Sequence, residues 1–178
     1  MSQPPGGDRD RDAAGRAQSA RPRDGLGRPL RHDAEGVGRV PEGLTLPPAE
    51  ALVEAQRWFD RGRPFHAHEV LEGTWKAAPA EERDLWQGLA QLAVALTHAM
   101  RGNTTGAVSV VSRGRDRIAR YADAPPHGID VLGLMAWADQ LLEELAESTS
   151  DPPGSFPLPQ LRRPDSGPQP AVVPGVPL

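Results

Sequence analysis

The sequence predicts an all-α domain of about five helices, and this prediction depends on three observations. Prolines interrupt helix interiors, and only four of the 20 prolines lie between residues 49 and 148. Apolar residues within this stretch recur at the spacing of one helix face. No part of the chain alternates apolar and polar residues between turn dipeptides, as β-hairpins do. We therefore expect a compact bundle with a buried central hairpin.

Glycines and prolines set the expected limits of the five helices. A proline at the first position favours the start of a helix, and a glycine just past the last turn favours its end. Gly62 and Gly102 occupy such end positions, and Asp130 is a suitable N-cap for the last helix. The expected helices cover residues 47–59, 64–77, 80–101, 104–121 and 130–147.

Both ends of the chain differ in composition from the helical middle, which we place at residues 45–148. Residues 1–44 mix eight arginines and seven acidic residues with glycines and few apolar side chains. Such a segment cannot bury enough apolar surface to offset the entropy of ordering, so we expect it to be disordered. Residues 149–178 predict a second disordered tail, proline-rich and extended, whose PLPQ and RRP pieces suit an aromatic groove.

Composition excludes several classes of function. The chain has no cysteine, so disulfides, thiolate metal ligands and cysteine nucleophiles are excluded. It has no apolar run of 18 residues, and its start, MSQPPGGDRDRD, lacks the hydrophobic segment of a secretory signal. We therefore expect a cytoplasmic, bacterial-type protein that does not act in a membrane.

The charge balance argues against nucleic acid as a partner. The helical middle holds 10 basic and 15 acidic side chains, a net charge of −5, which opposes binding to a phosphate backbone. Arg113, Arg117 and Arg120 form a basic stripe along one expected helix, which we interpret as a solvated face paired in part with Asp116. Gly114 lies on the neighbouring inward stripe, where its missing side chain predicts a close approach of two helices.

The stretch FHAHEVLEGTW places ionisable side chains on a helix face that also carries core residues. His68, Leu71, Glu72 and Trp75 follow helical spacing and share one face, which Leu71 and Trp75 should turn inward. We expect His66, which lies off that face, to be a solvated residue of the first turn.

The expected third helix can supply partners for this face. Its sequence, GLAQLAVALTHAM, is apolar on nearly every side, which is typical of a helix buried in the core. A short connection makes it the antiparallel neighbour of the helix before it, with Glu72 opposite Gln87 and His68 opposite Gln91. Gln91 and His98 need partners because an unpaired buried polar group costs about 1–3 kcal/mol.

The segments WFDRGRPFHAHEVLEGTWK and LWQGLAQLAVALTHAMRGNTTGA resemble the bacterial domain-of-unknown-function family 309, a small helical domain. Its signature is similar to F-N-x-G-x-[FY]-F-E-A-H-E-x-L-E-x-x-W, followed by Q-G-[LI]-x-Q and H-x-x-x-G-N-x-x-G-A. The resemblance covers about residues 50–125 and implies a fold but no established activity. Asp60, His66 and Thr97 depart from the pattern, which has Asn, Glu and often a second His there. The matching positions are Gly62, Ala67, His68, Glu69, Leu71, Glu72, Trp75, Gln87, Gln91, His98, Gly102 and Asn103.

Three interpretations of these residues are open from the sequence. In the first, His68, Glu72 and two glutamines form a hydrogen-bonded network between two helices. In the second, His68, Glu72 and His98 bind a divalent metal as part of an enzyme, although no cofactor is certain. In the third, a groove between stacked helical hairpins, lined by His66 and Glu69, holds a protein or small-molecule ligand. The role to which we commit is binding through the His68 and Glu72 region. The candidate cluster is His68, Glu69, Glu72, Trp75, Gln87, Gln91, His98 and Asn103.

Overall fold

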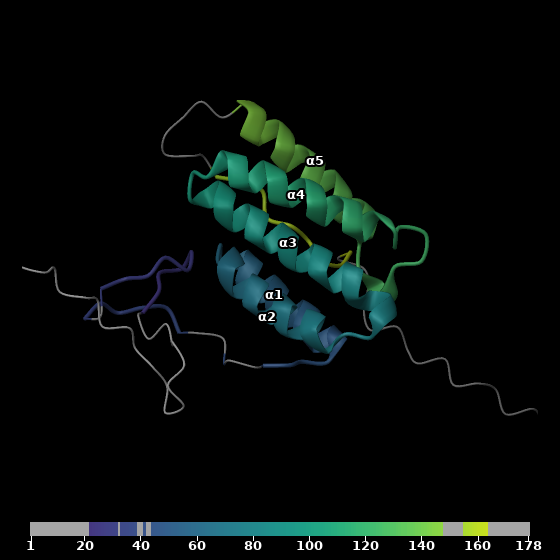
Figure 1. Cartoon of the computed structure of the whole chain (residues 1–178), viewed down its shortest axis with the longest axis horizontal. Helices are drawn as coiled ribbons and strands as arrows, with labels where there is room; N and C mark the ends of the chain where they lie inside the picture. The colour runs from purple at the N-terminus through teal and green to yellow at the C-terminus, as the bar shows by residue number, and fades with distance from the viewer. Residues whose placement is uncertain (1–21, 32, 39–40, 42–43, 148–154, 164–178) are drawn as a thin grey trace, which may run out of the picture.

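The computed structural model describes residues 22–31, 33–38, 41, 44–147 and 155–163 (Figure 1). This part of the chain contains five α-helices, two single-turn 3-10 helices and two isolated β-bridges, but no strand. The expected all-α fold is confirmed. None of the helices described is both long and apolar enough to cross a membrane. The helices are α1 (Pro48–Asp60), α2 (Pro64–Ala77), α3 (Arg83–Met100), α4 (Thr104–Ala119) and α5 (Val131–Glu147), with η1 (Ala80–Glu82) before α3 and η2 (Pro126–Gly128) before α5.

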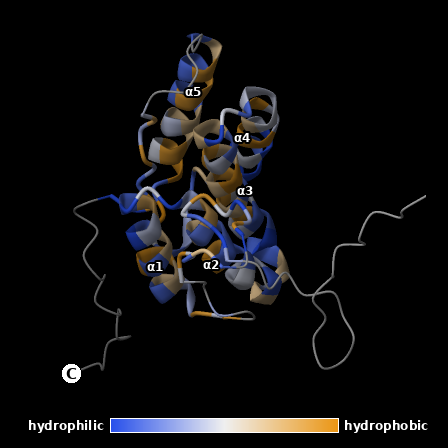
Figure 2. Cartoon of the chain, turned by 90° about the vertical axis from the view of Figure 1, so that its left-hand side faces the viewer, coloured by the Kyte–Doolittle hydropathy of each residue, from blue (hydrophilic) through white to orange (hydrophobic). Residues whose placement is uncertain are grey.

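The α-helices are arranged in chain order. Each α-helix packs against the next, and α3 occupies the centre of the row (Figure 1). The helices are amphipathic, with hydrophobic and hydrophilic residues on different sides (Figure 2). As expected for the central helix, α3 buries large side chains on several sides, including Leu85, Trp86, Leu89, Leu92 and Leu96.

The predicted helix ends agree with the structure. Gly62 after α1 and Gly102 after α3 have φ angles of 65° and 76°, in the left-handed region where a residue without Cβ has no steric penalty. Asp130 caps α5, because its Oδ1 accepts a hydrogen bond from the backbone nitrogen of Gly133 at 3.2 Å. The third expected helix is divided, since residues 80–82 form the tighter η1 before α3 begins.

Two glycines allow α3 and α4 to approach each other closely. A Cβ added at Gly88 would lie 2.6 Å from Ile118 Cγ2 and 3.1 Å from the carbonyl oxygen of Gly114. A Cβ added at Gly114 would lie 3.0 Å from Leu92 Cδ2. Neither position has room for a side chain unless a neighbour moves. The close approach expected at Gly114 is therefore confirmed, and Gly88 is its counterpart on α3.

Residues 155–163 form an extended segment, here called the C-terminal strap, that passes behind α3 and α4 in Figure 1. Gln56 of α1 binds its backbone twice: Nε2 donates to the carbonyl oxygen of Pro159 at 3.1 Å, and Oε1 accepts from the nitrogen of Leu161 at 2.8 Å. Trp137 of α5 donates its indole N–H to the strap backbone at 2.9 Å. The strap thus bridges α1 and α5.

The strap is the described part of the expected C-terminal tail. We expected residues 149–178 to be a proline-rich disordered tail; of the nine that the structure describes, Pro159 and Leu161 are buried and three are exposed. Composition alone could not show this, because the segment is fixed by distant side chains on α1 and α5. Its prolines also limit the conformational freedom that ordering removes. The other residues of that expected tail lie outside the described part of the chain.

Residues 22–31 and 33–38, here called the N-terminal loop, lie against the end of the bundle where α2 begins. The loop folds largely on itself, because the Asp24 carboxylate accepts hydrogen bonds from the backbone nitrogens of Leu26 at 2.9 Å and Arg28 at 2.8 Å. These residues form a turn within the segment that we expected to be disordered. Most other residues of the expected N-terminal tail lie outside the described part.

Candidate functional site

The predicted His68 and Glu72 lie one turn apart on α2, and their contacts run along that helix. His68 Nε2 is 3.8 Å from Glu72 Oε2, and Glu72 Oε1 is 2.9 Å from Lys76 Nζ. The His68 and Glu72 side chains are 24% and 34% exposed, so the pair is half-buried rather than inward-facing. Burial lowers the pKa of His68, Glu72 opposes that shift and Lys76 adds to it. The imidazole is therefore neutral at pH 7.

The hydrogen bonds expected between α2 and α3 do not form among the described residues. Gln87 and Gln91 make no hydrogen bond to Glu72 or His68, and Gln91 Oε1 is buried without a partner. The Cβ of Gln91 faces α4, 3.2 Å from where a Cβ on Gly114 would stand. On this side of α3, Gln91 makes no hydrogen bond to His68, the partner that we expected from the sequence, within the described residues.

The metal site considered from the sequence is not assembled. Within the described ranges, no three His, Asp or Glu side chains form a group that could hold a metal ion. His68 and Glu72 are adjacent, but His98 interacts with a different residue, as described below. Of the other candidates, Trp75 packs against the hydrophobic core and Glu69 is half-buried on α2.

His98 and Asn103 form a separate unit at the junction of α3 and α4. Asn103 caps α4 through Oδ1, which accepts from the nitrogen of Gly106 at 2.9 Å, and its Nδ2 lies 3.0 Å from His98 Nδ1. An amide nitrogen only donates, so His98 Nδ1 accepts and a neutral ring carries its proton on Nε2. Burial and then Arg101 lower the pKa of His98. The neutral ring therefore keeps one N–H donor at this end of the bundle.

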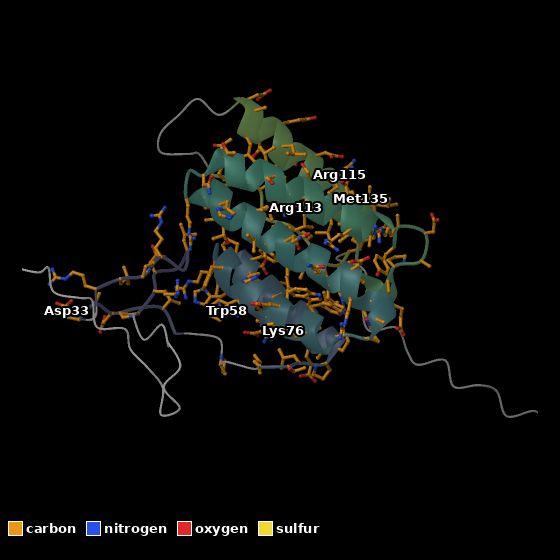
Figure 3. All side chains as sticks on the ribbon, in the orientation of Figure 1. Asp33, Trp58, Lys76, Arg113, Arg115 and Met135 are labelled. Carbon is orange, nitrogen blue, oxygen red and sulfur yellow. The ribbon has the colours of Figure 1, made fainter. Side chains whose placement is uncertain are left out.

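Aromatic rings and guanidinium groups gather at the same end, where α1 ends and α2 begins. The rings of Trp58 and His66 stack with centroids 4.7 Å apart and an interplanar angle of 23°. Phe65 meets the His66 ring edge-on at 5.8 Å, and the Arg101 guanidinium carbon lies 5.9 Å from the Phe65 centroid. Figure 3 shows Trp58 beside the N-terminal loop. We call this cluster the aromatic–arginine end; its members are Trp58, Arg61, Arg63, Phe65, His66 and Arg101.

His66 is 2% exposed, so the expectation that it is solvated was wrong. Trp58 covers one face of its ring, and the backbone of Gly38 forms a hydrogen bond with it. Burial and then Arg63 lower the pKa of His66, against smaller opposing contributions from Gly38 and Asp24. Helical spacing placed His66 off the face of α2 that packs on the core. Its ring is buried because α1 and the N-terminal loop pack over it, and the spacing of residues within one helix cannot predict such contacts.

The N-terminal loop covers the aromatic–arginine end with its turn. The backbone of Gly27 lies so close to the Phe65 ring that a Cβ there would overlap ring atoms. The Arg101 guanidinium donates a hydrogen bond to the carbonyl oxygen of Leu26. The guanidinium carbon of Arg23 lies 5.7 Å from the Phe65 centroid. The described residues of the loop add nothing to the hydrophobic core, so the contact consists of backbone and cation–π interactions.

Within the part of the chain that the structure describes, three buried polar atoms of this end have no hydrogen-bond partner: Trp58 Nε1, His66 Nδ1 and Arg101 Nε. Most buried polar groups in proteins are hydrogen-bonded, so each exception needs an explanation. Trp58 and Arg101 supply donors, whereas a histidine nitrogen donates or accepts according to its tautomer. The aromatic–arginine end therefore combines unused hydrogen-bonding groups with ring faces and positive charge.

The opposite end of the bundle holds another histidine–carboxylate pair, which sequence analysis did not predict. His127 Nε2 lies 2.8 Å from Glu82 Oε2, which also accepts from Trp86 Nε1 at 3.0 Å. Burial raises the pKa of Glu82, but hydrogen bonds from His127 and Trp86 outweigh it and lower the pKa. These contacts hold η2 against α3, and we assign them a structural role.

Sequence analysis missed Trp58, Phe65 and Arg101 as candidates. A usable signal was the run WFDRGRPFHAH, in which aromatic residues, histidines and arginines are interleaved. Arg101 carries no such signal, because only the fold joins it to the cluster. Two predicted residues border the end: the His68 ring is 6.3 Å from the Phe65 ring, and His98 lies one turn before Arg101. The predicted residues farther along the α2–α3 hairpin are Glu72, Trp75, Gln87 and Gln91.

Comparison with known proteins gives a family match but no activity. Residues 52–110 match the model of the domain of unknown function DUF309. The chain is 39% identical over 71 residues to the uncharacterized protein YpuF of Bacillus subtilis, covering 39% of this chain and 38% of that protein. It is 30% identical over 117 residues to an uncharacterized protein of Aquifex aeolicus, covering 64% of this chain and 34% of that protein. The chain therefore spans little more than a third of these curated relatives. No solved structure matches it.

Proposed function

We propose that the chain is a binding module for a polypeptide partner and that the aromatic–arginine end is its binding site. The observation that carries the proposal is that a peptide segment of the chain itself, the turn of the N-terminal loop, contacts this end chiefly through backbone groups. The Gly27 backbone packs against the Phe65 ring, and the carbonyl oxygen of Leu26 accepts a hydrogen bond from Arg101. Contacts of this kind suit a backbone from another chain as well.

The chemistry of the end supports a peptide over a simple anion. An extended peptide offers both N–H donors and C=O acceptors, and the unpartnered atoms at this end include indole and guanidinium donors beside a histidine nitrogen. A simple anion would satisfy the donors alone. His66 and His98 are neutral at pH 7, because burial lowers their pKa values. Neutral imidazoles exchange hydrogen bonds with peptide groups without adding a buried charge.

The N-terminal loop is held weakly compared with the C-terminal strap. The strap buries Leu161 and receives two hydrogen bonds from Gln56. The described residues of the loop bury no core side chain, and an exposed cation–π contact stabilises by about 0.5–1 kcal/mol. A partner that forms the same contacts can therefore replace the loop.

A valine in place of Gly27 in the intact chain exposes the site for a test. A Cβ at this position would overlap the Phe65 ring, and the φ of 74° is unfavourable for a β-branched residue. The substitution should therefore keep the turn off the site without shortening the chain. Gly38→Val is the matched control in the same loop, because no atom lies within 4 Å of the Cβ position there.

Binding is measured by fluorescence anisotropy with a labelled peptide of residues 22–31. Effective concentrations across short linkers are millimolar, so we expect a Kd of about 0.1–1 mM for the Gly27→Val chain. The wild type and Gly38→Val chains, whose own loop competes, should bind about two- to tenfold more weakly. Adding Phe65→Ala to Gly27→Val should abolish binding. No binding to the Gly27→Val chain, or binding that survives Phe65→Ala, contradicts the proposal.

A further inference from the structure

The N-terminal loop is a poor electrostatic match for the end that it covers. Residues 22–31 contain three arginines and one aspartate, a net charge of +2, and the aromatic–arginine end carries three arginines of its own. The pKa of Arg101 is lowered mainly by burial and further by Arg28 and Arg23, while Asp24 opposes the shift. Like charges thus lie near one another at the contact, and the Asp24 carboxylate of the turn offsets them in part.

Different residues of the N-terminal loop stabilise and weaken its contact with the aromatic–arginine end. Asp24 builds the turn, because its carboxylate accepts hydrogen bonds from the backbone of Leu26 and Arg28. The Arg28 side chain is exposed, and Arg31 pairs with Asp33 of the loop at 3.3 Å rather than with the bundle. The side-chain charges at 28 and 31 can therefore change without loss of the turn or of its contact with Phe65.

We infer that the partner is an acidic peptide segment with a glycine-containing turn like that of residues 24–27, and that it displaces the N-terminal loop. This inference rests on the proposed function and adds the charge of the partner and the means of its regulation. Glycine is required at the position of Gly27, because that backbone lies on Phe65 at a positive φ. Acidic residues around the turn suit the three guanidinium groups that the departing loop leaves behind.

The expected gain follows from the number of charges that change. Replacing Arg28 and Arg31 of the peptide by glutamate changes its net charge from +2 to −2. For an assumed mean separation of about 10 Å in water, partly screened by salt, four units of charge acting on three guanidinium groups give roughly a tenfold gain in affinity. Because the gain arises between exposed charges, it should shrink when the salt concentration rises.

The test compares three peptides on the intact Gly27→Val chain. The first is residues 22–31, the second carries Arg28→Glu and Arg31→Glu, and the third has the composition of the second in scrambled order. We expect the second peptide to bind about tenfold more tightly than the first at 0.1 M salt, with a smaller difference at 0.5 M. The third peptide should bind no more tightly than the first. The second should also compete measurably with the loop of the wild-type chain.

Matched variants of the chain locate the effect. Arg101→Gln should remove most of the difference between the first two peptides, whereas Arg113→Gln, the same charge change on the exposed face of α4, should leave it intact. If the second peptide binds no more tightly than the first, or the scrambled peptide binds as tightly as the second, the inference is overturned while the proposed function stands. If no peptide binds, both are overturned.

Discussion

Replacing Leu161 by alanine tests whether the C-terminal strap is part of the folded domain. Leu161 is 2% exposed, and its backbone nitrogen donates to Gln56 of α1. Leucine-to-alanine changes in cores destabilise by about 2–5 kcal/mol, depending on how far the site can collapse. An extended segment can shift to fill part of the cavity, so we expect the lower end, about 2–3 kcal/mol. With each kcal/mol lowering Tm by roughly 3–5 °C, the midpoint should fall by about 6–15 °C.

Thermal and urea unfolding followed by circular dichroism at the helix band would measure this loss. Leu132→Ala is the control, because it makes the same chemical change at a leucine that is 57% exposed. That variant should stay within about 0.5 kcal/mol of the wild type. If Leu161→Ala has the same thermal midpoint and free energy of unfolding as Leu132→Ala and the wild type, the strap does not stabilise the folded domain. The bridge that we describe between α1 and α5 would then be wrong.

Three further predictions concern the α2 ion pair, the helix contact and the buried histidine. Glu72→Gln should change the free energy of unfolding by less than about 1 kcal/mol, because its partners are solvent-accessible; a loss of several kcal/mol in urea unfolding would restore the network hypothesis. Gly88→Ala should destabilise by about 1–3 kcal/mol through overpacking against Ile118, and a stabilised variant in the same assay would mean that helix propensity wins. The pKa of His66 is lowered in the folded chain, so the unfolded state binds more protons as pH falls through about 6.5. Stability should therefore decrease between pH 7.5 and 5.5, and His66→Phe should reduce that decrease; equal slopes for both proteins would refute the assignment.

The helices could be predicted because their signals are local. Gly62 and Gly102 end helices through their own backbone conformations, and Pro64 starts α2 at the position where its missing N–H has no partner to lose. The contact at Gly114 was also predictable, since a glycine on an inward stripe has few other roles. Each of these inferences needed only the residue and its neighbours within a turn or two.

The candidate site was predicted only in part, because spacing assigns a helix face but not its depth. His68 and Glu72 do share a face with Leu71, yet they lie at its half-exposed edge. His66 lies off that face and is nevertheless buried, since Trp58 and the N-terminal loop cover it. Contacts between segments so far apart in sequence leave no periodic pattern that a single chain can reveal.

The two hydrogen bonds between Gln56 and the C-terminal strap, here called the clasp, have a consequence for the kinetics of folding. The helices pack in chain order, so most of their contacts join segments close in sequence, and such topologies fold quickly. The hydrogen bond from Leu161 to Gln56 instead joins distant segments, because it closes a loop of 105 residues. The entropic cost of closing this loop is offset only after the helices have packed together and formed the surface that the strap contacts. During synthesis, α1 through α5 should therefore assemble first, and the clasp should close last.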